Sequence, residues 1–370
     1  MRIAFVKDFL PLMRGAEKVL EALCEIYPDA DIYALFHNKG ALSPTIERHK
    51  ISTSFIQNLP LVQTHYRYYL PFFPTAIERF DLREYDVILS QSQCVAKGAI
   101  KSPNTLHICY CLTPMRYIWD MYDVYFPKDE MGLLKRAIVP PIANYLRRWD
   151  IATLERVDKF VAISTCVAER IKKWYCRQSD VIFPPADDVF YTPSGAKRED
   201  FYLLAGAFAP YKRTDLAINA FIKLGKRLVV IGSGQDERKI QALASGHSNI
   251  ELLGWQPNDV LRDYYRRARA LIFPGEEDFG IVPVEAQLCG MPIIAYGRGG
   301  ALDTVVDGRT GVFFNEQTVE GVCDVVNRFE QMKFSSEIIR ANVLRLGKQK
   351  FKDAMKQYIE REYELFRSKK

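Results

Sequence analysis

The sequence lacks the long apolar runs, clustered cysteines and strong charge excess that mark specialised protein classes. No apolar stretch approaches the roughly 20 residues that a membrane-spanning helix needs. The eight cysteines are scattered through apolar segments, which indicates reduced, buried thiols. The net charge of +6 is mild and fits an anionic small molecule or membrane surface, and no nucleic-acid motif accompanies it. Lys7 interrupts the N-terminal apolar run, so we expect a cytoplasmic protein without a signal peptide.

The remaining composition is that of a globular chain large enough for two domains. It has 370 residues, of which 48% are hydrophobic and 26% charged. Short β-rich runs alternate with helical patterns, and a stretch rich in Pro, Asp and Gly at 181–200 separates two such series. We therefore predict an α/β fold with two doubly wound, Rossmann-like domains, at residues 1–190 and 200–350. In such sheets, ligands bind at the carboxyl ends of the strands.

The stretch PGEEDFGIVPVEAQLCG carries two carboxylates, Glu277 and Glu285, on either side of a small turn. The residues before it predict a strand and those after it a helix, and a glycine permits the sharp turn between them. Three backbone N–H groups would then point out of the helix N-terminus: those of Gly280, Ile281 and Val282. This arrangement suits a phosphate.

The two carboxylates cannot bind the same anion, because like charges repel. They would instead accept hydrogen bonds from hydroxyl groups on either side of it. A nucleotide sugar fits this pattern, since it has a diphosphate in the middle and a polyol at each end. Glu285 has an alternative role, because an acid near a helix N-terminus can complement the helix dipole.

Other predicted strand–helix junctions offer groups that suit the same ligand. Lys212 and Arg213 would neutralise a leaving diphosphate, because no Asp-x-Asp pair stands in a suitable metal loop. A solvated cation pair is the alternative. Gly234 ends the run VVIGSG, and Gly15 precedes the helical pattern AEKVLEAL, so either backbone can approach a phosphate. An ordinary turn explains either glycine equally well.

The first half contains a candidate acceptor region. The stretch LPLVQTHYRYYLPFFPTAIERF at 59–80 packs aromatic residues beside Arg67 and Arg79. It fits a bilayer surface or a lipid-linked acceptor, or else Pro-broken helices within a domain core. After the strand HICYCL, the acceptor side would be lined by Arg116, Tyr117 and Asp120. Arg116 would pair with an acceptor diphosphate or with Asp120.

The segment EEDFGIVPVEAQLCGMPIIAYGRGG resembles the retaining glycosyltransferases of family 4. Their mark is Glu-x7-Glu, followed by G-x-P-[VI]-[IV]-A and a Gly-Gly turn. PYKRTDLAINAF and RGAEKVLEAL resemble the same family at corresponding positions. TPMRYIWD resembles a subgroup of bacterial mannosyltransferases and hexosyltransferases of O-antigen and exopolysaccharide synthesis. The resemblance spans nearly the whole chain.

This resemblance implies the GT-B fold, in which two Rossmann-like domains face each other across a cleft. The first domain would bind the acceptor and the second the donor, and the last helix, 351–370, would pack back on the first domain. The implied chemistry is a front-face attack that retains the anomeric configuration, with the leaving phosphate accepting the acceptor's proton. It needs no enzymatic nucleophile, metal or cofactor.

The resemblance also assigns roles to individual residues. Glu277 would contact the transferred hexose and Lys212 the diphosphate, which makes these two the catalytic residues. Glu285 would hold the ribose hydroxyls. The backbone of residues 279–282 would bind hexose and phosphate. The other implied donor contacts are Phe279 in that segment and, near the base, Gly254 and Trp255.

Two positions depart from the family pattern. Family members with the T-P-x-R-Y stretch commonly have a hexose-contacting His where this chain has Leu112, and many have an Arg where it has Ala207. We expect transfer of mannose or glucose, from GDP-mannose or UDP-glucose, to a growing and lipid-linked bacterial surface polysaccharide. Peripheral contact with the inner face of the cytoplasmic membrane would accompany it. Because Leu112 cannot hydrogen-bond, a non-catalytic nucleotide-sugar-binding subunit of a glycan assembly complex is the alternative.

Overall fold

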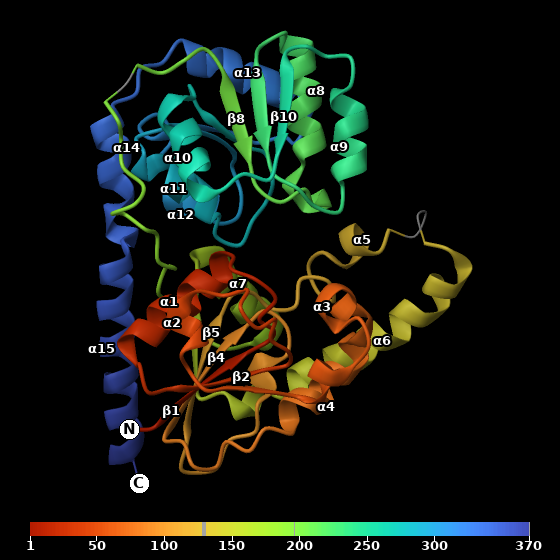
Figure 1. The fold of residues 1–370 in the computed structure, drawn as a ribbon, viewed down its shortest axis with the longest axis vertical. Coiled ribbons are helices and arrows are strands. Elements are labelled where there is room, and N and C mark those ends of the chain that lie inside the picture. Colours follow the sequence, from red (N-terminus) through yellow and green to blue (C-terminus); the bar gives the residue numbers. More distant parts are fainter. Residues whose placement is uncertain (128–130, 196, 370) are drawn as a thin grey trace. The chain divides into compact units, whose positions relative to one another are not determined.

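The structure is a computed structural model that describes residues 1–127, 131–195 and 197–369. These residues form two compact units (Figure 1). Unit 1 comprises residues 1–185 and 349–370, and unit 2 comprises residues 186–348. Ala196, in the predicted linker, and Lys370, in the predicted last helix, lie outside the described residues.

Unit 1 is built on a seven-stranded parallel sheet with the order β3-β2-β1-β4-β5-β6-β7. Every residue of β1, β4 and β5 is buried, including the polar Lys7, Gln91 and His107, because both faces of a parallel sheet are covered. The strands are β1 (Ile3–Lys7), β2 (Asp31–Ala34), β3 (Ile51–Thr53), β4 (Val87–Ser92), β5 (Leu106–Cys111), β6 (Lys159–Ala162) and β7 (Ser179–Val181).

Helices surround the sheet of unit 1. They are α1 (Gly15–Ile26), α2 (Pro44–Glu47), α3 (Val62–His65), α4 (Phe73–Glu78), α5 (Tyr122–Tyr125), α6 (Leu133–Ala152), α7 (Thr165–Tyr175) and α15 (Lys348–Ser368). Ser164 caps α7, because its Oγ accepts a hydrogen bond from the N–H of Val167 at 3.1 Å. The last helix, α15, packs on unit 1, where Tyr358 donates to Asp180 at 2.8 Å.

Unit 2 is built on a six-stranded parallel sheet with the order β10-β9-β8-β11-β12-β13. The strands are β8 (Tyr202–Ala205), β9 (Leu228–Ile231), β10 (Ile250–Gly254), β11 (Leu271–Phe273), β12 (Ile293–Tyr296) and β13 (Gly311–Phe314). The helices are α8 (Thr214–Leu224), α9 (Glu237–Ala244), α10 (Asn258–Arg267), α11 (Ile281–Leu288), α12 (Ala301–Thr304), α13 (Val319–Glu330) and α14 (Ser336–Val343). The two parallel sheets confirm the predicted pair of doubly wound α/β domains.

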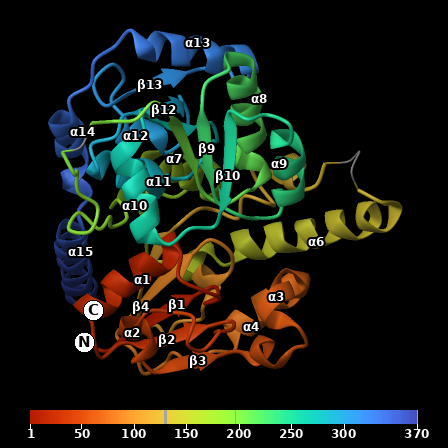
Figure 2. The same ribbon diagram turned by 45° about the horizontal axis from the view of Figure 1, so that its top comes forward.

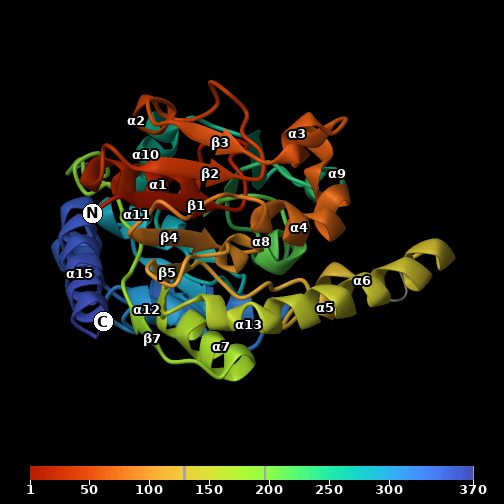
Figure 3. The same ribbon diagram turned by 90° about the horizontal axis from the view of Figure 1, so that it is seen from below.

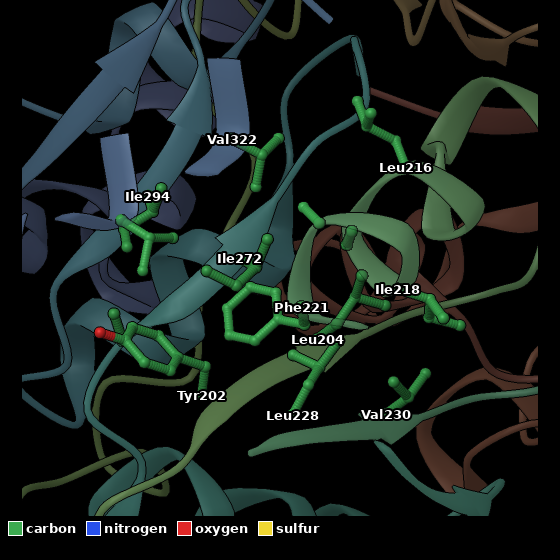
Figure 4. Close-up of a cluster of buried hydrophobic side chains, with 14 of the residues drawn as sticks. Tyr202, Leu204, Leu216, Ile218, Phe221, Leu228, Val230, Ile272, Ile294 and Val322 are labelled. Atoms are coloured by element: carbon green, nitrogen blue, oxygen red, sulfur yellow. The ribbon is translucent and has the colours of Figure 1, made fainter. Parts of the chain in front are cut away.

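The core of unit 2 lies between the sheet and its helices (Figure 4). Phe221 of α8 and Val322 of α13 are both 0% exposed, and they pack on strand residues such as Val230 and Ile294. Each buried side chain of this size contributes about 2 kcal/mol of hydrophobic stabilisation. This core holds the strand ends, and the loops that follow them, in fixed positions.

Both sheets contain a topological switch point, where the strand order reverses beside the first strand. The switch lies between β1 and β4 in unit 1, and between β8 and β11 in unit 2. In open α/β sheets, a ligand binds just beyond the carboxyl ends of the strands at such a point. In unit 2 the loop after β8 carries Lys212, and the loop after β11 carries Glu277.

Candidate functional site

The turn between β11 and α11 forms the centre of the candidate site. Gly280 has a φ of +81°, in the left-handed region that favours glycine, and a Cβ there would lie 2.9 Å from the ring of Phe273. The helix begins at Ile281, and no side chain among the described residues caps it. The N–H groups of Ile281 and Val282 therefore have neither a helical nor a side-chain partner, which leaves them for an anion.

Lys212 and Glu277 meet at the switch point, although they are far apart in the sequence. Lys212 Nζ lies 2.8 Å from Glu277 Oε1. Only 17% of the Lys212 side chain and 18% of the Glu277 side chain are exposed. The two loops also touch through their backbones, since a Cβ at Gly275 would lie 2.7 Å from Lys212 Cα. A cation is thus held beside the start of α11.

Arg213 occupies a strained backbone position next to Lys212. Its φ is +52°, which costs an L-residue about 1 kcal/mol. The residue precedes α8, and its Nε contacts Asp215 Oδ1 at 3.4 Å. Lys239 contacts the other oxygen of Asp215 at 3.3 Å. Strain of this kind concentrates at functional sites, which supports a ligand role for this loop.

Glu285 lies in the second turn of α11 and is only 5% exposed. The first turn contains no acid, and the dipole effect fades beyond that turn, so dipole complementation does not explain Glu285. Its carboxylate lies close to the phenols of Tyr191 and Tyr265. Burial and this carboxylate together raise the pKa of both phenols. A carboxylate is costly to bury unless hydrogen bonds satisfy it, so this position indicates a specific hydrogen-bonding role.

A third loop, after β12, completes the arrangement, and the sequence analysis used it only as a family mark. The N–H of Gly300 donates to the carbonyl of Glu277 at 2.8 Å. A Cβ at Gly300 would lie 2.3 Å from Phe279 Cα, so only glycine allows this approach. Gly299 packs on Glu277 in the same way. The Gly-Gly turn therefore packs closely against the backbone of residues 277–279.

Three other donor-side predictions, Gly234, Gly254 and Trp255, also lie at this edge of the sheet. A Cβ at Gly234 would lie 2.4 Å from the carbonyl oxygen of Phe208, so backbone packing already requires this glycine. Its contact with a phosphate stays a prediction. Gly254 ends β10, and Trp255 follows it with 71% of its surface exposed. A large aromatic side chain left this exposed is available for stacking on a flat ligand group.

The structure places the predicted acceptor residues in unit 1, where their contacts are internal. Arg116 is 7% exposed, and its Nη2 contacts Met121 Sδ at 2.8 Å. The hydroxyl of Tyr117 lies 2.9 Å from Cys94 Sγ, and burial raises the pKa of this phenol. Gly15, which was predicted as a donor contact, begins α1 in the same unit. None of these contacts tests an acceptor role.

Asp120 holds its segment against α7. It forms ion pairs with Arg170 at 3.4 Å and Lys173 at 3.2 Å. The indole N–H of Trp174 also donates to it at 2.9 Å. These partners give Asp120 a structural role, and its contact with an acceptor stays a prediction.

His107 cannot replace the histidine that the family pattern has at Leu112. It is 0% exposed in the middle of the sheet, with Nε2 2.8 Å from Ser90 Oγ and Nδ1 2.9 Å from the carbonyl of Arg156. Burial lowers the pKa of His107 to about 4. Leu112 itself is 8% exposed and packs at the end of β5.

Neither a metal-binding cluster nor a membrane-spanning helix is found among the described residues. Across residues 1–127, 131–195 and 197–369, no three His, Cys, Asp or Glu side chains gather into a set that could hold a metal ion. In the same parts of the chain, every helix is too short or too polar to cross a bilayer. The metal-free chemistry implied by the resemblance stays a prediction.

Residues 192–345 match the family model described as "Glycosyl transferases group 1". The matched range contains the three loops that meet at the switch point of unit 2. Nearly all of unit 2 is therefore similar to the group 1 glycosyltransferases. This finding confirms the glycosyltransferase resemblance that Glu277, Glu285 and the residues between them carried in the sequence.

Similar sequences are glycosyltransferases. Over 188 residues, the chain is 28% identical to an uncharacterized glycosyltransferase of Methanocaldococcus jannaschii, a match that covers 49% of this chain and 53% of that protein. The chain spans about half or less of the length of the curated relatives it matches, namely 53%, 42% and 39% for three of them.

Similar solved structures cover both units of the chain. The lipopolysaccharide outer core galactosyltransferase WaaB is 17% identical with a TM-score of 0.68, and the match covers 98% of this chain and 100% of that chain. HepE of Anabaena, solved in complex with UDP-glucose, is 15% identical with a TM-score of 0.68, over 97% and 100% of the two chains. These likenesses confirm the predicted GT-B class of fold.

Proposed function

We propose that the protein is a retaining glycosyltransferase of family 4 that moves a hexose from a nucleotide sugar to a growing glycan. The observation that carries the proposal is the Lys212–Glu277 pair, 2.8 Å apart, beside the uncapped start of α11. A cation and free backbone N–H groups at the carboxyl edge of a sheet suit a pyrophosphate. A carboxylate in contact with that cation suits the hydroxyl groups of the adjoining sugar.

In the proposed reaction, the bond between the hexose C1 and the phosphate oxygen breaks while the acceptor oxygen bonds to C1 from the same face. The acceptor's proton passes to an oxygen of the leaving phosphate. Negative charge therefore grows on the diphosphate, where Lys212 and the N–H groups of Ile281 and Val282 stabilise it. Fixed donors of this kind each contribute about 3–4 kcal/mol to the transition state.

The other residues would orient the donor. Glu277 accepts hydrogen bonds from the hexose, and the buried Glu285 accepts them from the ribose. Trp255 and Gly254 would border the base, while Arg213, Gly234 and Gly15 would contact the phosphates. HepE of Anabaena was solved with UDP-glucose, which supports UDP-glucose as one donor to test, with GDP-mannose as the other.

We further propose that the acceptor is a lipid-linked oligosaccharide of a bacterial surface polysaccharide, used at the inner face of the cytoplasmic membrane. Arg116, Tyr117 and Asp120 would belong to the acceptor side. The name of WaaB, a galactosyltransferase of the lipopolysaccharide outer core, supports an acceptor of this class.

The test is release of nucleoside diphosphate from UDP-glucose and GDP-mannose by the purified chain, with and without EDTA. We expect turnover in EDTA and, with an acceptor extract, a product whose anomeric proton coupling matches that of the donor. A strict requirement for a divalent ion, or an inverted product, contradicts the proposal. Binding of nucleotide sugars without turnover, with turnover restored by Leu112→His, would instead indicate a non-catalytic subunit of a glycan assembly complex.

A further inference from the structure

The first half of α6 projects from unit 1, and the described residues cover little of it. Residues 132–138 are all exposed, Leu133 by 86%, Leu134 by 73% and Ile138 by 45%. All three views agree that this half extends away from the sheet of unit 1 (Figures 1, 2 and 3). A surface helix normally buries its apolar side chains along one face. Here the apolar side chains meet water, so this helix end lacks the environment that its sequence suits.

The second half of the same helix is firmly held. Leu146 is 0% exposed, and the indole N–H of Trp149 donates to Glu78 of α4 at 2.8 Å. Asp150 forms a buried ion pair with Lys97, with 2.9 Å between Oδ1 and Nζ. The projecting half is therefore fixed to the domain core at one end, as a support for a docking surface must be.

Two prolines separate the fixed half from the projecting half. Pro140 and Pro141 lie inside α6 and have no N–H to donate to the helix. Neither proline can therefore donate the helical hydrogen bond to the residue four positions earlier. The rest of the helix therefore adds little to the stability of the projecting turns. An environment that covers their apolar side chains would stabilise them.

The charge of α6 indicates what that environment is. From 133 to 152 the helix has four basic residues and one acidic residue, Asp150, which is buried in its ion pair with Lys97. Lys135 and Arg136 are exposed directly beside Leu133 and Leu134, and Arg148 is exposed further along the helix. Interleaved basic and large apolar side chains are typical of helices that lie in the interface of an anionic bilayer.

We propose that the projecting half of α6 docks unit 1 on an anionic membrane surface. Leu133, Leu134 and Ile138 enter the acyl boundary, while Lys135 and Arg136 contact lipid phosphates. A second copy of the chain is a poorer occupant, because a symmetric contact would bring the same basic residues together. The proposal deepens the proposed function, because a lipid-linked acceptor lies at a membrane surface. Its biological purpose rests on that proposed function.

The aromatic stretch that the sequence analysis offered for this role divides into two parts. Phe73 and Ile77 of α4 are buried in the core of unit 1. Leu61, Tyr68 and Phe72 are exposed by 71%, 79% and 54%. Only the exposed part of the stretch is available for contact with a membrane.

The experiment is flotation of the full chain with vesicles of neutral phosphatidylcholine or of phosphatidylcholine with phosphatidylglycerol. We expect binding to the anionic vesicles, which weakens in high salt. Leu133→Ser with Leu134→Ser lowers the partition coefficient by about tenfold for each leucine. Lys135→Glu with Arg136→Glu lowers it by at least about fivefold for each residue. Val189→Ser is the matched control, because Val189 is 85% exposed in unit 2 and should leave binding unchanged.

Two further measurements keep the outcomes distinct. The melting temperature and nucleotide-sugar binding of both α6 variants should equal those of the wild type, because the replaced side chains make little contact with the core. Equal vesicle binding by wild type and the leucine variant overturns the proposal. So does a dimer that the leucine variant converts to monomers in sedimentation while vesicle binding stays absent. Vesicle binding without turnover leaves this proposal standing and counts against the proposed function alone.

Discussion

Lys212→Met is the substitution that most sharply tests the chemistry assigned to unit 2. Methionine keeps the length and apolar stem of the side chain but removes the charge that lies 2.8 Å from Glu277. If Lys212 stabilises the leaving diphosphate, its loss should cost about 3–4 kcal/mol in the transition state. This corresponds to a fall of about 10²–10³ in kcat/KM.

The cost of the same change to folding should be small. Only 17% and 18% of the two side chains are exposed, but Glu277 keeps some access to water when the cation is removed, so the loss should be about 1 kcal/mol, the low end for a group left without its hydrogen-bond partner. A loss of that size lowers the melting temperature of a unit this large by about 2–4 °C. The large kinetic effect is therefore separable from the small effect on stability.

The assay is steady-state release of nucleoside diphosphate, with Lys239→Met as the matched control. Lys239 also pairs with a carboxylate, that of Asp215 at 3.3 Å, but 64% of its side chain is exposed. We expect the control to stay within about twofold of the wild type, as a screened surface pair should. A Lys212→Met enzyme within about threefold of the wild type, or an equal loss in the control, would refute the assignment.

Three other substitutions test separate parts of the structure. Glu285→Gln should weaken nucleotide-sugar binding about tenfold, because a hydrogen bond to a charged acceptor is lost. The melting temperature should stay level or rise, because a buried carboxylate is replaced by a neutral amide. Unchanged affinity in calorimetry contradicts this role. Arg213→Gly relieves a φ of +52° but removes a cation, so donor affinity should fall with a shift in melting temperature below about 3 °C, and unimpaired affinity argues against a phosphate contact. Burial lowers the pKa of His107 from 6.5 to about 4, so the unfolded chain binds the proton first as the pH falls. The contribution of His107 to the free energy of unfolding is therefore complete above pH 6.5 and decreases by roughly 3 kcal/mol as the pH falls toward 4. Denaturant titrations of His107→Gln should lack this dependence of stability on pH. An unchanged dependence would contradict the reasoning.

Elements with local signals could be predicted from the sequence. Helix α7 spans Thr165–Tyr175, and Ser164 just before it is a residue type that caps helices. Helix α8 ends before Gly225, which adopts the left-handed conformation with a φ of +65°. Signals of this kind depend on neighbouring residues alone and so survive in a single sequence.

Elements that depend on distant partners were missed. Strands β3 and β13 are short, and pairing with β2 and β12 defines them more than their own composition does. Helix α6 contains Pro140 and Pro141, which argue against a helix in the sequence. Packing of Leu146 and Trp149 against the core holds its second half in helical form despite them.

The candidate site was predicted in its parts but not in its assembly. The turn at Gly280 and the cation at Lys212 follow from local chemistry. The ion pair of Lys212 with Glu277 could not be foreseen, because it depends on β8 and β11 being neighbours in the sheet. The phenols beside Glu285 and the approach of Gly300 to Phe279 likewise depend on how separate loops pack.

The central claim is that a pyrophosphate binds at the start of α11, and a crystal soaked with UDP-glucose or GDP-mannose tests it most directly. We predict diphosphate density within about 3 Å of the N–H groups of Ile281 and Val282 and of Lys212 Nζ, with the ribose beside Glu285. An empty site there contradicts the claim. So does ligand density at the opposite edge of the sheet, in the cavity of about 360 Å³ lined by residues such as Arg269.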